Sequence, residues 1–151
     1  MRFLTFLIGC VYSGCTQANI TELQSLNFGT IALVDNSSVG DIIVDKFGNV
    51  TSTSHFRVVI PPQPAHFLID GLAPNTGVSI AISHSATQMS PLTSSPETLT
   101  FSLIESAEYV VADANGEAEI KIGAKLSTSG NGSLNFAQTD YRINYQVTFL
   151  Y

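Results

Sequence analysis

The chain has 151 residues, with six Lys and Arg against twelve Asp and Glu, which gives a net charge of -6. This length suits one domain with a sizeable core, and the negative charge argues against nucleic acid or an anionic membrane as a partner. Only 12% of the residues are charged, against about 25% in ordinary soluble domains, so we expect an exported β protein whose polar faces carry Ser, Thr and Asn.

Residues 1–18 have the pattern of a signal peptide. Arg2 precedes an apolar run over residues 3–12, and small residues lead to a predicted cleavage site after Ala18. The apolar run is too short to span a bilayer, so we expect no membrane span. The mature protein would then be a single β-sandwich domain of residues 19–151.

The two cysteines, Cys10 and Cys15, both fall within this predicted signal peptide. Lipidation of either cysteine is an alternative to simple cleavage. After cleavage the mature domain contains no cysteine, so we expect packing rather than a disulfide to hold it together in an oxidising compartment.

Short strands separated by turns are predicted throughout the mature domain. The first segment, residues 19–25, has Ile20 and Leu23 as its only aliphatic residues and is predicted to be a flexible lead-in or an edge strand. No long stretch has helical periodicity, which favours an antiparallel β-sandwich. The strands expected next are residues 26–34, 40–44, 55–60, 66–69, 77–83, 98–104, 109–111 and 118–127.

Turn and loop residues separate these strands. Gly29, inside a predicted strand, indicates a bulge or a close backbone approach. Residues 46–49 are predicted to form a tight hairpin turn, and residues 113–116 are expected to turn a second hairpin between the strands on either side of them. Residues 85–97 and 130–140 are predicted to be loops, because they lack a consistent period.

The most regular pattern lies at residues 141–151. One parity is apolar and comprises Tyr141, Ile143, Tyr145, Val147, Phe149 and Tyr151. The other parity is polar apart from Leu150. Because successive side chains of a strand point to opposite faces, this spacing predicts a half-buried strand. Its apolar face would either fill the core of its own domain or be offered to a partner.

The sequence contains no constellation typical of an enzyme or a cofactor site. His55, His66 and His84 lack the spacing of zinc ligands. There is no Gly-x-Ser-x-Gly motif, and the mature domain has no thiol nucleophile. The alternating oxygen-bearing side chains between Asp113 and Glu119 are better explained by a hairpin turn than by a calcium loop. We therefore expect no catalytic activity, cofactor or metal.

Several segments together carry a resemblance that covers nearly all of the mature chain. The sequence resembles a bacterial secreted family, domain of unknown function 4402, which is itself similar to the subunits of chaperone-usher fimbriae. The segments that carry the resemblance are residues 26–29, 67–71, 78–80, 113–116, 122–126, Tyr141 and residues 145–151.

The resemblance implies an immunoglobulin-like antiparallel β-sandwich, incomplete and completed by a donated strand. It also implies export to the bacterial periplasm and the cell surface, with a periplasmic chaperone, an outer-membrane usher and other subunits as partners. In such subunits a partner adds a strand through main-chain hydrogen bonds and alternate side-chain pockets. The residues expected at this partner-strand interface are Tyr145, Val147, Phe149, Tyr151, Ile20 and Leu23.

Two features keep alternatives open. Ile20 and Leu23 do not share a parity, which speaks against residues 19–25 as a donor strand for another subunit. The apolar tail could equally fill a self-contained core. In that case the chain would be a secreted binding module that recognises a carbohydrate or a protein through its loops.

Overall fold

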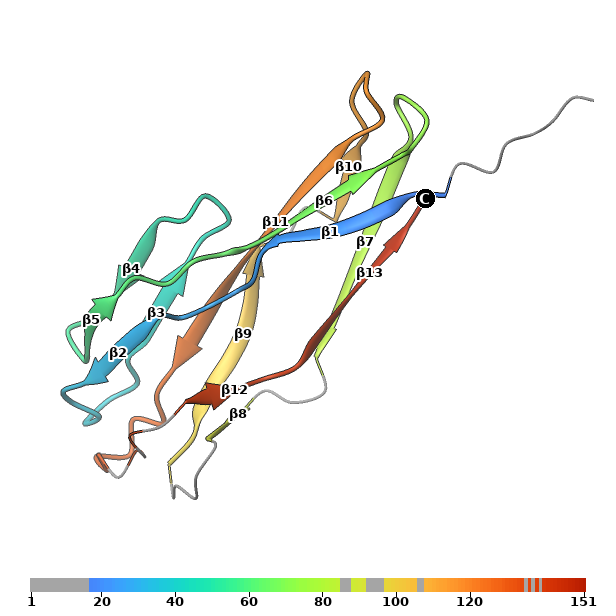
Figure 1. Ribbon diagram of the computed structural model, residues 1–151. Helices are drawn as coiled ribbons and strands as arrows, with labels where there is room; N and C mark the ends of the chain where they lie inside the picture. The colour runs from blue at the N-terminus through green and yellow to red at the C-terminus, as the bar shows by residue number, and fades with distance from the viewer. Residues whose placement is uncertain are drawn as a thin grey trace, which may run out of the picture.

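The computed structural model describes residues 17–84, 88–91, 97–105, 108–134, 136, 138 and 140–151. Apart from its last two residues, the predicted signal peptide lies outside this part of the chain. The described residues form thirteen β-strands, every pair of which is antiparallel. No helix among them is long and apolar enough to cross a membrane. The expected all-β antiparallel sandwich is confirmed (Figure 1).

The strands belong to one large sheet and two small ones. In chain order they are β1 (Asn19–Gln24), β2 (Thr30–Leu33), β3 (Asp41–Val44), β4 (Val50–Ser52), β5 (Phe56–Ile60), β6 (Ala65–Asp70), β7 (Gly77–His84), β8 (Gln88–Pro91), β9 (Leu99–Glu105), β10 (Tyr109–Val111), β11 (Ala118–Ser127), β12 (Tyr141–Arg142) and β13 (Tyr145–Leu150). The large sheet has the order β1-β6-β11-β9-β8-β12, and the β3–β4 hairpin joins it through β11. The small sheets are β10-β7-β13 and β2-β5.

Two clusters of buried side chains fill the space between the sheets. We call them the β7 cluster, which comprises Ala65, Ile69, Leu72, Val78, Ile80, Ala112, Ala118, Ile120 and Ile122, and the β9 cluster, which comprises Phe28, Ile42, Val44, Phe56, Leu99, Phe101, Ala124 and Leu126. The strand β11 contributes to both clusters, because its inward side chains alternate with outward ones along its whole length. It therefore joins the two halves of the core.

Two glycines allow backbone segments to approach closely. Gly29 has a φ of +67°, and a Cβ there would collide with the carbonyl oxygen of Ile60, so the close approach expected within residues 26–34 is confirmed. Only Thr30–Leu33 of that stretch is strand. A Cβ on Gly123 of β11 would lie 2.6 Å from the carbonyl oxygen of Val44. Glycine thus lets the end of β3 lie directly against β11.

The second predicted hairpin is wrong in its pairing. The turn itself is present, since the Asp113 carboxylate accepts hydrogen bonds from the backbone N–H groups of Asn115 (2.8 Å) and Glu117 (2.9 Å). However, β10 pairs with β7, whereas β11 pairs with β6, β3 and β9. The turn carries the chain from one sheet to the other, and local turn chemistry does not specify that change of partner.

Two further expectations need correction. The predicted loop at residues 85–97 contains β8, which pairs with both β9 and β12. The tail is two strands rather than one, because β12 pairs with β8 in the large sheet while β13 pairs with β7 in a small sheet. The chain passes from one layer to the other at Ile143 and Asn144, although the alternation of partly buried and exposed side chains continues across the break.

Buried polar side chains fasten the segment that follows β11. The Asn36 amide donates to the Ser129 hydroxyl (3.0 Å), to the Asn131 side-chain oxygen (3.1 Å) and to the Ser133 carbonyl (2.6 Å). The buried Glu97 carboxylate accepts from Asn131 (2.9 Å) and Ser129 (3.0 Å). These hydrogen bonds, the one from Asn131 first, lower the pKa of Glu97 against the opposing effect of burial.

Replacing Phe101 should test the β9 cluster. Its ring is buried and packs edge-on against Phe28, with 6.3 Å between ring centroids. We expect Phe101→Ala to lower the free energy of unfolding by about 3–5 kcal/mol, because it leaves a cavity. The matched control Val59→Ala, at a side chain that is 62% exposed, should change it by less than about 1 kcal/mol. Urea unfolding measures both values. Similar losses of unfolding free energy in Phe101→Ala and Val59→Ala would contradict the burial of Phe101 in the β9 cluster.

Acid should destabilise the fold through Glu97. Its pKa is lower in the folded chain, so its stabilisation is complete above the unfolded glutamate pKa of about 4.3. This stabilisation is lost as the pH falls through the folded-state pKa. We expect Glu97→Gln to lower the Tm at neutral pH and to flatten the fall of Tm on acidification. Thermal unfolding over a pH series measures this, with Glu108→Gln, at an exposed carboxylate, as the control that keeps the original slope.

Candidate strand-pairing interface

The structure does not bring the histidines together. No group of three or more His, Cys, Asp or Glu side chains is placed to hold a metal ion within the described part of the chain. His66, on the outer face of the large sheet, lies 3.2 Å from the exposed carboxylate of Glu119. The side chain of His84 lies outside the description.

His55 has the residue types of a catalytic triad around it, but not the geometry. Its Nε2 atom lies 2.9 Å from the Ser38 hydroxyl and 3.5 Å from the Asp35 carboxylate, while its Nδ1 atom lies 3.1 Å from the Thr53 hydroxyl. A triad needs the carboxylate on the ring nitrogen opposite the serine. Here both groups share one nitrogen, and the arrangement ties the segment after β2 to the start of β5.

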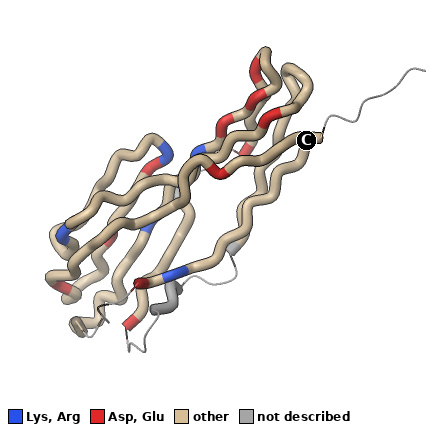
Figure 2. The backbone as a smooth tube through the Cα atoms, viewed as in Figure 1, with Lys and Arg blue, Asp and Glu red and all other residues tan. Residues whose placement is uncertain are grey.

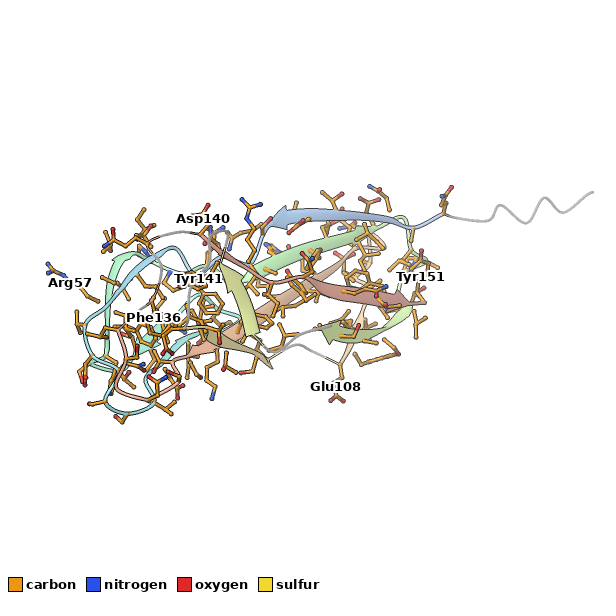
Figure 3. The ribbon with its side chains drawn as sticks, turned by 90° about the horizontal axis from the view of Figure 1, so that it is seen from below. Arg57, Glu108, Phe136, Asp140, Tyr141 and Tyr151 are labelled. Atoms are coloured by element: carbon orange, nitrogen blue, oxygen red, sulfur yellow. The ribbon has the colours of Figure 1, made fainter. Side chains whose placement is uncertain are left out.

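The tail of the chain places its apolar residues inward, as predicted. Tyr145, Val147 and Phe149 on β13 are partly buried, whereas the residues between them are exposed. Val147 and Phe149 pack against the β7 cluster. Tyr151 departs from this pattern, because it is 57% exposed and lies at the opposite end of the molecule from Arg57 (Figure 3).

The first described strand, β1, is an edge strand of the large sheet. Of the two alternatives predicted for residues 19–25, a flexible lead-in or an edge strand, the structure has the edge strand. Ile20 pairs with Ile69 and Glu22 pairs with Phe67 of β6. Directly opposed residues of an antiparallel pair point to the same face, and Ile69 is wholly buried in the β7 cluster. Ile20 and Glu22 therefore project from the interior face of the sheet.

The interior face at β1 is nevertheless exposed. Ile20 is 46% exposed although its neighbour Ile69 is completely buried. A β-bulge falls between Glu22 and Gln24, and it leaves Leu23 out of the register at 52% exposure. An inward aliphatic side chain with this much exposure means that no strand of the described part of the chain covers it.

The strands β1 and β13 each have one unpaired edge within the described part of the chain. β1 pairs only with β6, and β13 pairs only with β7. Figure 1 shows the end of β13 and the start of β1 at the same end of the molecule, and the rings of Phe67 on β6 and Phe149 on β13 meet edge to face with 5.9 Å between their centroids. We call this region the open edge, defined by Ile20, Glu22, Tyr145, Val147 and Phe149.

A charge lies within this otherwise apolar region. Burial raises the pKa of Tyr145 above that of a free tyrosine, and the negative charge of Glu22 raises it further. The charge of Glu22 on β1 thus acts on the Tyr145 hydroxyl of β13, which also forms a hydrogen bond with the backbone of Leu26. Among the described residues, no Lys, Arg or His forms an ion pair with Glu22.

The open edge can pair with an extended chain. It offers unpaired backbone N–H and C=O groups, and inward side chains at alternate positions of each strand. Of the six residues expected at a partner-strand interface, four lie on the inward faces of these two edge strands, namely Ile20, Tyr145, Val147 and Phe149. Leu23 and Tyr151 are exposed and lie outside this pattern. Sequence reasoning missed Glu22 and Phe67. The alternation of Ile20 with Glu22 was visible, but only the register with β6 shows that this parity faces inward.

Titration of Tyr145 tests the geometry of the open edge. We expect Glu22→Gln to lower the pKa of Tyr145, because it removes a nearby negative charge that disfavours the phenolate. Ultraviolet absorbance of the phenolate measures this as the difference between each protein and its Tyr145→Phe counterpart. Glu119→Gln, on the outer face of β11, should leave the Tyr145 pKa unchanged. An unaltered pKa in Glu22→Gln would place the two side chains apart.

The raised pKa of Tyr145 also predicts how alkali affects the fold. A phenol that holds its proton more tightly in the folded chain contributes stability below the unfolded tyrosine pKa, about 10. That contribution is lost as the pH rises through the folded-state pKa. We therefore expect Tyr145→Phe to lose less stability than the parent protein on transfer to strongly alkaline buffer, as measured by urea unfolding.

Comparison with known proteins assigns the chain to a family. The family model described as "Domain of unknown function (DUF4402)" matches residues 18–151, a region that contains all thirteen strands and both strands of the open edge. The resemblance to this family noted in the sequence is thus confirmed. No curated protein and no solved structure matches the chain. The chain belongs to the family described as domain of unknown function 4402.

Proposed function

We propose that the chain is an exported structural or adhesive subunit of a fimbria-like surface assembly, joined to a neighbour by a donated β-strand. The observation that carries the proposal is the exposure of the interior face at the open edge. Ile20 sits beside a fully buried residue and is still 46% exposed. A strand inserted between β1 and β13 would cover it and pair with both unpaired edges.

The chemistry of the open edge suits an extended polypeptide better than a small molecule. Val147 and Phe149 present apolar surface at alternate positions of β13, so a partner strand with apolar residues at every second position would match them. Each fully buried valine of such a strand contributes about 1.5–3 kcal/mol. Ordering the strand costs about 1–2 kcal/mol per residue, so the backbone hydrogen bonds are needed as well.

The chain takes the part of the strand acceptor in this proposal. Its own segment of residues 19–25 is mostly β1, which pairs with β6 over five residue pairs. Donating it to another subunit would break that pairing. By resemblance to chaperone-usher fimbriae, the expected donors are a periplasmic chaperone during export and another subunit in the assembly.

Tethering a strand to the chain tests the proposal. The end of β13 and the start of β1 lie at the same end of the molecule (Figure 1), and β13 pairs only with β7 in the described part of the chain. A turn of about four residues after Tyr151 followed by a strand of about seven residues can therefore return along the unpaired edge of β13. We expect a strand with Val inward and Thr outward to raise the Tm. A net gain of about 2 kcal/mol corresponds to roughly 6–10 °C.

The control fusion has the same composition with its register shifted by one residue, so that Thr points inward. It should leave the Tm close to that of the parent chain. Equal Tm values for the two fusions would refute strand acceptance. That result would favour the alternative function, a self-contained secreted module that binds a carbohydrate or a protein.

A further inference from the structure

The inward charge on β1 is not explained by the fold itself. Glu22 belongs to the same parity as Ile20, and both project from the interior face of the large sheet. The expected occupant of such a position in a sandwich is an aliphatic side chain. No cation among the described residues pairs with the Glu22 carboxylate, and the side chain remains exposed.

The neighbours of Glu22 place it within the open edge. Its partner on β6, Phe67, packs against Phe149 of β13. The register therefore places Glu22 where β6 packs against β13. The surface that a partner strand would meet is therefore apolar along Val147 and Phe149, and anionic at Glu22.

We propose that Glu22 selects the partner strand: the occupant of the open edge is an extended segment of another protein with apolar residues facing Val147 and Phe149 and a Lys or Arg facing Glu22. This inference rests on the proposed function and specifies the chemistry of the donor. An all-apolar strand would bury the carboxylate without a partner, which is costly. A strand with an acidic residue there would add repulsion. The same carboxylate thus discourages indiscriminate edge pairing.

The whole chain is acidic, so a general attraction for cations must be separated from a specific one. The net charge is -6, and Figure 2 shows acidic residues gathered towards the end that carries the turn between β10 and β11. A lysine anywhere on a partner would gain something from this field. Only a contribution that depends on Glu22 supports the proposal.

The tethered strands provide the test. In the fusion with inward valines, the inward valine nearest Glu22 is replaced by Lys in one protein and by Glu in another. We expect the Tm of the Lys fusion to exceed that of the Glu fusion by about 5 °C, in line with a partly exposed charge pair. The difference should shrink at about 1 M NaCl, where charges are screened within about 3 Å.

Variants of Glu22 show whether the difference in Tm between the Lys and Glu fusions comes from this carboxylate. In Glu22→Gln the difference between the Lys and Glu fusions should fall to about 1 °C or less, and in Glu22→Lys its sign should reverse. A difference that survives unchanged in Glu22→Gln would overturn the inference, because the preference would then come from the overall field. Should neither the valine nor the Lys fusion exceed the register-shifted control, strand acceptance itself fails. That outcome is distinct from a loss of charge preference alone.

Discussion

The alternation of inward and outward side chains along β11 is the constraint on which the rest of the sandwich depends. Its inward residues contribute to both buried clusters, and its two edges pair with β6, β3 and β9. Along one edge of β11, the paired strand changes from β6 to β3 at Gly123. Glycine is needed at this position because a side chain would collide with the backbone at the end of β3 and in the β3–β4 turn. The outer strands β1 and β13 are each held by hydrogen bonds to a single neighbouring strand in the described part of the chain.

The open edge follows from this arrangement. β1 and β13 are outer strands of different sheets, and each is held on one side only. Edge strands with exposed apolar side chains are a hazard for association with other chains, which proteins commonly limit with an inward-pointing charge. Glu22 occupies such a position. The unpaired edges that would admit a partner strand belong to β1 and β13, and the charge that would restrict its sequence, Glu22, lies on β1.

Much of the local structure could be predicted from residue types. Asp45 and Asp113 each hydrogen-bond the backbone of the turn that follows them, and these turns were recognised from Asp, Asn and Gly. The inward parity of Tyr145, Val147 and Phe149 was also predicted correctly. The pairing of β10 and the division of the tail into two strands were not, since both involve a change of sheet that leaves the alternation intact.

By itself the sequence determined where the chain turns and which side chains share a face. Both properties depend on neighbours a few residues away, through local hydrogen bonds and the two-residue period of a strand. Only the tertiary structure decided which strands are neighbours and which edges remain unpaired. A backbone ladder accepts any strand of suitable length, so the choice depends on how both clusters pack around β11, and that packing leaves Ile20 and Glu22 inward yet uncovered.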